Sequence, residues 1–289
     1  MELILEYLGR AMNKKASDVF IVSGMPVSFK INGEIVPENE EKVMPERANE
    51  LVSALYTLAG RSMEHFLQTG DDDFSVSVKN LARFRVSAYR QRGSLAAVIR
   101  TVSFSVPDRE QMEIPDEVMK IATMTLGLVL VTGPAGGGKS TTMACITDAI
   151  NRTRSAHIIT IEDPIEYLHR DVKSIVSQRE LATDTDSYVT ALRASLRQAP
   201  DVIMLGEMRD LDTIRIAMTA AETGHLVIST LHTVGAVNTM DRIIDVFPPN
   251  QQQQIRVQLA MVLRTVISQQ LLPTIGGGQA PAFEIMHLN

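Results

Sequence analysis

The sequence predicts an α/β domain with a mainly parallel sheet, preceded by a smaller α+β domain. From residue 116 onward, short apolar segments alternate with helical segments, which is typical of parallel strands covered by helices. A glycine-rich stretch separates the first of these apolar segments from the helix that follows it. Before residue 105, strand-like segments instead follow one another around short turns. A chain of 289 residues is long enough for two domains of ordinary size.

Residues 1–104 are predicted to form the α+β domain. Apolar residues at helical spacing predict a helix over 2–15, and strand-like segments follow at 18–22 and 27–36, with Asn32-Gly33 as a hairpin turn. The rest of this domain is expected in the order helix 45–58, helix 61–68, strand 74–78, strand 82–89 and strand 94–102.

Residues 105–115 are predicted to be a linker and hinge, because they contain Pro107 and several charges and end at Pro115. Residues 116–289 then form the second domain. Its expected strands are 126–131, 157–161, 202–205, 225–231, 265–272 and 281–286. Its expected helices are 141–150, 188–197, 210–221, 235–246 and 250–263.

The stretch between strand 126–131 and helix 141–150 matches G-x-x-x-x-G-K-[ST], the phosphate-binding P-loop. Backbone N–H groups of such a loop surround phosphates, and the helix N-terminus favours anions. Lys139 is expected to reach the β- and γ-phosphates of ATP, and the Ser140 hydroxyl to hold Mg²⁺. An ordinary glycine-rich turn is the alternative, and the flanking strand and helix disfavour it. The expected nucleotide contacts here are Gly133, Pro134, Ala135, Gly136, Gly137, Gly138, Lys139, Ser140, Thr141 and Thr142.

Acidic residues follow two of the predicted parallel strands. Glu162, Asp163 and Glu166 follow strand 157–161, and Glu207 and Asp210 follow strand 202–205. Acids at the C-terminal ends of parallel strands point into the crevice where α/β folds bind ligands, so they are candidates for holding Mg²⁺ and the attacking water. For Asp163 and Asp210, a role as helix N-cap or solvated loop charge is an equally good interpretation.

Two further groups could contact phosphate. His225 and His232 flank strand 225–231 and are expected to sense phosphate charge, since imidazole changes protonation easily. They do not resemble a metal pair, because no third ligand lies at useful spacing. Two successive strands of the first domain carry Arg83, Arg85, Arg90, Arg92 and Arg100. These arginines have two interpretations. They form a solvated basic face of the sheet, or one or two of them reach a nucleotide bound at a domain or subunit boundary.

Composition excludes several classes of protein. The net charge is −6 and no run of Lys or Arg stands out, which argues against a nucleic-acid partner. The single cysteine, Cys145, allows neither a disulfide framework nor a four-cysteine zinc site and is expected to be a small buried residue. The acidic N-terminus does not resemble a secretory signal, and the apolar stretch at 121–131 is too short to span a bilayer. We therefore expect a cytoplasmic protein that reaches a membrane only through partners.

Four stretches, in order, resemble the signature boxes of the type II/IV secretion ATPases. They are 133–142 (Walker A), 159–167 (Asp box), 192–210 (Walker B) and 222–233 (His box), with further likeness at 18–36, 83–100 and 269–272. Within the family, the strings TIEDPIEY and GEMRD and the short first domain most resemble the retraction ATPases of type IV pili. The long N-terminal extension and zinc cysteines of assembly ATPases are not present.

The resemblance implies a PAS-like N-terminal domain joined to a RecA-like ATPase domain, assembled as a homohexameric ring. It implies Mg²⁺-dependent ATP hydrolysis coupled to domain rotation, which powers pilus retraction and twitching motility through an inner-membrane platform protein. A paralogous pilus ATPase is a further implied partner. By position, Glu162 is the implied general base, Glu207 sits with Mg²⁺ and the water, and His225 and His232 read the phosphate state. Arg85 and Arg100 are implied to contact phosphate from the N-terminal domain.

The chain departs from the family pattern in two places. Gly137 stands where a Ser-like residue is usual, and the chain stops at Asn289, before the family's C-terminal helices with their Ala-Ile-Arg-Asn-Leu-Ile-Arg-Glu-like motif. Two alternative functions therefore stay open: a pilus assembly or type II secretion ATPase, and an accessory nucleotide-binding subunit with little turnover. A small-molecule kinase would need a lid and an acceptor pocket, for which no sequence feature is seen.

Overall fold

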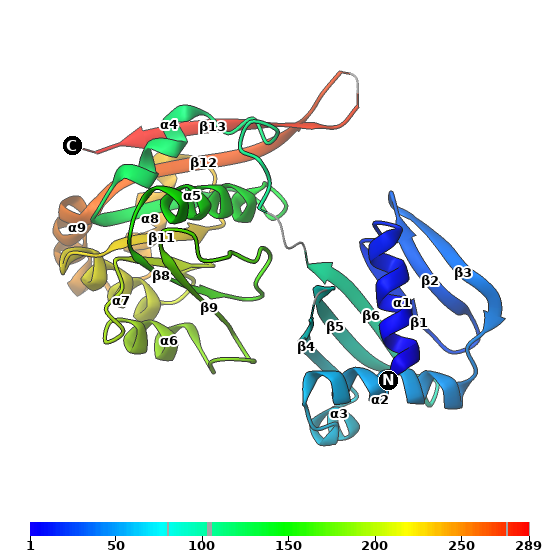
Figure 1. Ribbon diagram of the computed structural model, residues 1–289. Coiled ribbons are helices and arrows are strands. Elements are labelled where there is room, and N and C mark those ends of the chain that lie inside the picture. The colour runs from blue at the N-terminus through cyan, green and yellow to red at the C-terminus, as the bar shows by residue number, and fades with distance from the viewer. Residues whose placement is uncertain (80, 103–105, 276, 289) are drawn as a thin grey trace. The chain divides into compact units, whose positions relative to one another are not determined.

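The computed structural model describes residues 1–79, 81–102, 106–275 and 277–288. The chain divides into two compact units, Met1–Phe104 and Ser105–Asn289, which are described separately (Figure 1). None of the described helices is long and apolar enough to cross a membrane.

The first unit is built on an antiparallel sheet with strand order β3-β2-β1-β6-β5-β4. Helices α1 and α2 pack against it, and their apolar faces form one core with the inward-facing strand residues. The elements are α1 (Glu2–Asn13), β1 (Asp18–Ile21), β2 (Pro26–Ile31), β3 (Glu34–Lys42), α2 (Pro45–Ala59), α3 (Glu64–Thr69), β4 (Asp71–Val78), β5 (Ala82–Gln91) and β6 (Ser94–Val102). The predicted α+β organisation agrees with this order to within a few residues at most element ends.

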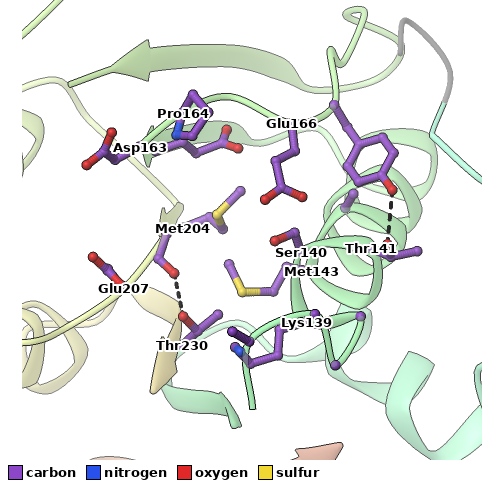
Figure 2. Close-up of a pocket in the computed structure, with 18 of the residues that line it drawn as sticks. Lys139, Ser140, Thr141, Met143, Asp163, Pro164, Glu166, Met204, Glu207 and Thr230 are labelled. Carbon is purple, nitrogen blue, oxygen red and sulfur yellow. Dashed lines mark hydrogen bonds between the residues drawn. The ribbon is translucent and has the colours of Figure 1, made fainter. Parts of the chain in front are cut away.

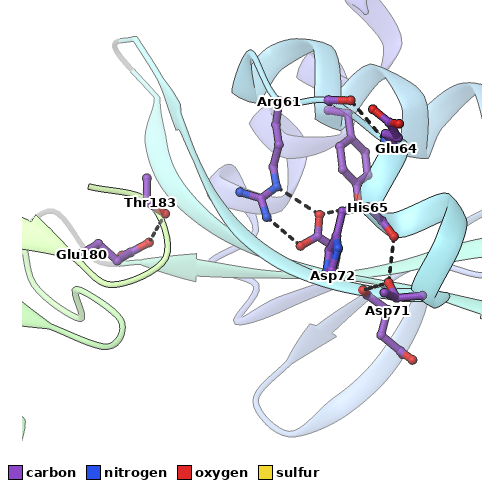
Figure 3. A network of polar contacts seen from close by, with 10 residues as sticks. Arg61, Glu64, His65, Asp71, Asp72, Glu180 and Thr183 are labelled. Atoms are coloured by element: carbon purple, nitrogen blue, oxygen red, sulfur yellow. Dashed lines mark hydrogen bonds and ion pairs between the residues drawn. The ribbon is translucent and has the colours of Figure 1, made fainter. Parts of the chain in front are cut away.

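A buried carboxylate ties the helical side of this unit to its edge strand β4 (Figure 3). Asp72 accepts hydrogen bonds from Arg61 Nε at 3.0 Å and Nη2 at 2.9 Å, and from the Tyr56 hydroxyl at 3.1 Å. Tyr56 also packs on the rings of Phe66 and Phe74. A buried charge is tolerated when both of its oxygens are hydrogen-bonded, as they are here. This network is structural and lies within the first unit.

The second unit is built on a sheet with strand order β13-β12-β7-β11-β10-β8-β9, parallel except for β13. Its first elements are α4 (Asp116–Met119), the 3₁₀ helix η1 (Lys120–Thr123), β7 (Gly127–Thr132), α5 (Lys139–Thr153), β8 (His157–Glu162), β9 (Ile175–Glu180) and α6 (Tyr188–Ser195). The others are β10 (Val202–Leu205), α7 (Leu211–Glu222), β11 (Leu226–Leu231), α8 (Ala236–Asp245), α9 (Pro249–Val262), β12 (Leu263–Pro273) and β13 (Gln279–His287).

Helices cover both faces of this sheet. Leu128 and Leu130 of β7 belong to a core shared with α6, α7, α8 and α9, whereas Val129 and Val131 face a core shared with α4, η1 and α5. Strands buried on both faces are expected to be continuous apolar runs, and all six residues of β7 are buried. The predicted parallel α/β architecture is therefore confirmed.

Three features were not predicted. Strand β9 was missed because its sequence, Ile-Val-Ser-Gln-Arg-Glu, is largely polar and lies at the sheet edge. Helix α4 and η1 were also missed. The described part of the expected linker, from Val106 onward, packs on the second unit: Ile114 is buried in its core, and Cys145 Sγ donates a hydrogen bond to the Pro107 carbonyl at 3.3 Å. Residue 105 lies outside the described residues.

Candidate active site

The glycine-rich loop, residues 133–138, joins β7 to α5 at the C-terminal edge of the parallel strands. Helix α5 begins at Lys139, whose ammonium group donates hydrogen bonds to the carbonyls of Gly133 at 2.9 Å and Pro134 at 2.8 Å. Burial lowers the pKa of Lys139, and the charges of Glu166 and Glu207 oppose that shift. The lysine is therefore held at the loop, facing carboxylates from two other elements.

Strand β12 supports the loop from behind through Gln269. Gly133 has φ 142° and Gly138 has φ 82°, and a Cβ on these residues would lie 2.0 Å from the Gln269 carbonyl and 2.6 Å from its Nε2. Only glycine fits so close an approach with such dihedral angles. Thr142, a predicted nucleotide contact, instead donates its hydroxyl to Gln269 Oε1 at 2.7 Å and is fully buried. Its side chain therefore fastens α5 to β12 and does not line the pocket described next.

A pocket of about 560 Å³ lies in front of the loop (Figure 2). It brings together the loop from Ala135 to Thr141, His232 and acidic residues from both clusters, which are Glu162, Asp163, Glu166 and Glu207. Gly133 and Pro134 do not line it; they supply the carbonyls that hold Lys139. A pocket of this size suits a nucleotide. The structure therefore gathers residues as far apart in the sequence as Ala135 and Leu271 around one pocket.

Glu162, the last residue of β8, is the most buried carboxyl of the pocket, with 8% of its surface exposed. Its Oε1 accepts hydrogen bonds from Thr160 Oγ1 at 2.6 Å and from Gln178 Nε2 at 3.2 Å. Burial raises the pKa of Glu162 to about 7, although both donors act to lower it. A carboxylate with a pKa near neutrality is suited to accept a proton from water.

Glu207 lies just beyond β10 and has charged partners. Its Oε1 lies 2.7 Å from Arg209 Nε, and its Oε2 lies 3.3 Å from His232 Nε2. The Ser140 hydroxyl points into the same pocket from α5, and Glu166 enters from the loop after β8 (Figure 2). No group of three or more His, Cys, Asp or Glu among the described residues could form a metal cage. Mg²⁺ bound with a nucleotide uses one or two protein oxygens plus phosphates and waters, so Ser140 and Glu207 fit it.

The two histidines are separated by the strand between them. His232 follows the C-terminal end of β11 and lines the pocket. His225 precedes the N-terminal end of the same strand, at the opposite edge of the sheet, roughly 20 Å away at 3.3 Å per residue. Its Nδ1 lies 2.9 Å from the Ala220 carbonyl at the end of α7. His225 therefore does not line this pocket, and its contact with phosphate stays a prediction.

The arginines predicted to contact phosphate both lie in the first unit. Arg85 on β5 and Arg100 on β6 are directly paired across the two strands. Arg100 Nε lies 3.0 Å from Asp18 Oδ1, with most of its side chain exposed. Their contact with a nucleotide stays a prediction.

Several pocket residues were not singled out from the sequence. Tyr167 OH lies 3.0 Å from Thr141 Oγ1 and so links the loop after β8 to α5. Tyr188, Thr230 and His169 also line the pocket, and Thr230 Oγ1 donates to the Gly206 carbonyl at 2.5 Å. Tyr167 is inside the TIEDPIEY string, His169 lies two residues beyond it and Thr230 lies two residues before His232, which were usable signals, whereas Tyr188 stands apart from these stretches.

Asp210 is a helix cap. Its side chain accepts hydrogen bonds from Thr213 N at 2.8 Å and Thr213 Oγ1 at 2.7 Å, and it begins α7. The open question for Asp210 is therefore resolved in favour of capping. Asp163 caps no described helix: it precedes Pro164 through a cis peptide bond and lines the pocket.

A phosphate-binding loop on a parallel sheet, faced by carboxylates at the ends of two neighbouring strands, defines a P-loop ATPase. The family model described as "Type II/IV secretion system protein" matches residues 1–278, and the chain belongs to this family.

Its relatives include proteins of type IV pili. The "Type IV pilus retractation ATPase PilT" of Pseudomonas aeruginosa is 43% identical over 284 residues, covering 98% of this chain and 82% of the relative. The "Twitching motility protein" of Neisseria gonorrhoeae is 45% identical over 262 residues, covering 90% of this chain and 70% of the relative. A crystal structure of the pilus retraction motor PilT with bound ADP superimposes with a TM-score of 0.93 at 46% identity, covering 99% of this chain and 83% of that one.

Proposed function

We propose that this chain is a Mg²⁺-dependent ATP hydrolase that works as a homohexameric motor in type IV pilus retraction. The observation that carries hydrolysis is Glu162, a buried carboxyl that lines the same pocket as the phosphate-binding loop. Support for retraction comes from the 43% identity, over 98% of this chain, to a protein named as the retraction ATPase.

In the proposed reaction, the loop N–H groups and Lys139 bind the phosphates of ATP. Bound Mg²⁺ would supply positive charge that offsets the negative charge of the phosphates. Ser140, on α5, and Glu207, just beyond β10, would hold the ion. Glu162 takes a proton from the attacking water at its carboxylate, which raises the nucleophilicity of that water. His232, next to Glu207, is positioned to respond when the phosphate charge changes.

The motor part of the proposal requires partners and differential affinity. ATP must favour one arrangement of the two units and ADP another, since a ligand shifts an equilibrium only by its difference in affinity. The proposed partners are other copies of the chain in a ring, an inner-membrane platform protein and a paralogous pilus ATPase. The proposed location is the cytoplasm, at the inner membrane through the pilus machinery.

The test combines ATP turnover with particle mass on the purified chain, with and without Mg²⁺. We expect Mg²⁺-dependent hydrolysis by a six-subunit particle. Binding without turnover, or a stable monomer, would contradict the motor and favour an accessory subunit. Deletion in the source cell separates the two pilus roles: excess pili indicate a retraction motor, and cells without pili indicate an assembly ATPase.

A further inference from the structure

Gln178 makes three hydrogen bonds at the back of the active site, none of which the sequence predicted. Its Oε1 accepts the His169 backbone N–H at 2.8 Å, and its Nε2 donates to the Tyr167 carbonyl at 2.9 Å and to Glu162 Oε1 at 3.2 Å. A backbone N–H can only donate and a carbonyl can only accept. These two backbone partners therefore fix the orientation of the amide, and its NH₂ group must face Glu162.

The register of the sheet explains why Gln178 reaches this carboxyl. Strand β9 runs parallel to β8 with Thr160 opposite Gln178 and Glu162 opposite Glu180. Residues two apart on a strand share a face, so the Thr160, Glu162 and Gln178 side chains lie together. Thr160 Oγ1 donates to the same Oε1 atom at 2.6 Å. Two neutral donors thus hold one oxygen of the Glu162 carboxylate.

We propose that Gln178 is a positioning residue, which orients the Glu162 carboxylate and anchors the loop after β8 for water activation. This rests on the proposed hydrolase function. Burial alone favours the neutral carboxyl, which cannot accept a proton, and a donor at hydrogen-bond distance favours the charged form. Gln178 therefore both orients the Glu162 carboxylate and favours its deprotonated form.

Other charged and titratable groups surround Glu162 and are the same in every variant compared below. They are Asp163, Glu166 and His169 on the loop after β8, Glu180 on β9, Tyr188 at the start of α6, Glu207 and Arg209 beyond β10, and Lys139 on α5. A change in the pH profile between wild type and a variant at position 178 then reports the substituted group.

The test is Gln178→Glu, which has nearly the same shape and keeps an acceptor for His169 N–H but loses the NH₂ donor. Two carboxyls at this distance share a proton until higher pH. At pH 7 we expect kcat to fall by about 10-fold, the KM for ATP to stay within about 3-fold, and the midpoint of the acid limb of kcat to rise by about one pH unit. Gln178→Leu also lacks the donor and should move the midpoint in the same direction.

Asn151→Asp is the matched control, because it makes the same amide-to-acid change at a residue of α5 that also holds the loop after β8 through two backbone groups. Asn151 donates to the Arg170 carbonyl at 2.7 Å and accepts from Val172 N at 3.1 Å. The midpoint should be unchanged in this variant. An unshifted midpoint in Gln178→Glu, or an equal shift in Asn151→Asp, overturns the positioning role. Failure of the wild-type chain to hydrolyse ATP would instead overturn the proposed function.

Discussion

Glu162 ends β8 and Glu207 lies just beyond the neighbouring strand β10, yet the groups that surround the two carboxylates are of different kinds. Strands β8 and β10 are hydrogen-bonded neighbours, with Ile161 opposite Leu205. Glu162 is buried among neutral donors, whereas Glu207 is paired with Arg209 and lies near His232. The difference teaches that position at the end of a strand brings a carboxylate to the site, and its immediate partners decide its task.

Local sequence produces this difference. Glu162 is still part of β8, and its side chain is buried, with donors from its own strand and from β9 at hydrogen-bond distance. Glu207 lies beyond β10, after Gly206, where a Cβ would be 2.8 Å from the Tyr188 hydroxyl. The glycine lets the chain pass close to Tyr188, and the following residues turn toward the pocket with their charged partners. We therefore expect a proton acceptor at Glu162 and a cation ligand at Glu207.

The largest expected effect is that of Glu162→Gln on turnover. The amide keeps the shape and an acceptor oxygen but cannot take a proton, so kcat should fall by about 10²- to 10⁴-fold. Binding of ATP should persist, because Lys139 and the loop are untouched. Steady-state ATPase assays beside a fluorescent-nucleotide titration measure both quantities. Turnover at the wild-type rate would mean that another group is the base.

Glu207→Gln should act through the metal. Losing the carboxylate charge weakens the hold on Mg²⁺, and we expect the Mg²⁺ concentration for half-maximal turnover to rise by about 10-fold or more. Glu162→Gln should leave that concentration unchanged in its residual activity. A titration of kcat with Mg²⁺ at saturating ATP checks this. Identical curves for Glu207→Gln and wild type would show that Glu207 is not a ligand of Mg²⁺.

Turnover itself should depend on pH through Glu162. The base acts when deprotonated, and burial raises the pKa of Glu162 to about 7. The rate constant kcat is therefore expected to rise with pH through about 7 and to level off above it. A profile of kcat from pH 5.5 to 9 at saturating Mg²⁺ and ATP measures the midpoint. A flat profile across this range would contradict a proton-accepting role with this pKa.

Because of the Glu162 carboxyl, the free energy of unfolding should fall over the pH range in which kcat rises. An unperturbed glutamate has a pKa of 4.5, whereas the pKa of Glu162 in the folded protein is about 7, so the folded state binds more protons between those pH values. The cost to stability is absent below pH 4.5, grows as pH rises and is complete above 7. It amounts to about 3 kcal/mol. Glu162→Gln should thus be more stable than wild type at pH 8 but not at pH 4.5. Urea unfolding at the two pH values measures this difference. Glu207→Gln is the control and should not be more stable than wild type at pH 8.

Much of this site was predictable because its parts are local in sequence. The loop at 133–140 and both acidic clusters are short strings beside apolar strands, and the structure brings most of their residues to one pocket, with Gly133, Pro134 and Asp210 outside its lining. The fold was predictable for the same reason, since strands and helices alternate with clear periods. The prediction was weaker for residues whose position depends on which end of a strand they occupy. His225 and His232 were both assigned to phosphate, although one precedes the N-terminal end of β11 and the other follows its C-terminal end.

The rest depended on contacts between distant segments. Gln178 reaches Glu162 only because β9 pairs with β8, and β9 is too polar to be recognised as a strand from its own sequence. Gln269 supports the glycine-rich loop only because β12 returns to pair with β7. Such supporting residues carry no local pattern, because their role is set by the register of strands far apart in the chain.

Asp210→Ala gives the smallest expected effect and separates structure from function within one acidic cluster. Asp210 is three residues from Glu207, but its carboxylate caps α7 through Thr213 and does not line the pocket. Losing an N-cap costs about 1 kcal/mol. Unfolding of the second unit should shift by about 2–4 °C, while kcat and the Mg²⁺ requirement stay at wild-type values. A loss of turnover comparable to that of Glu207→Gln would show that the two acids share one task, and that capping does not account for Asp210.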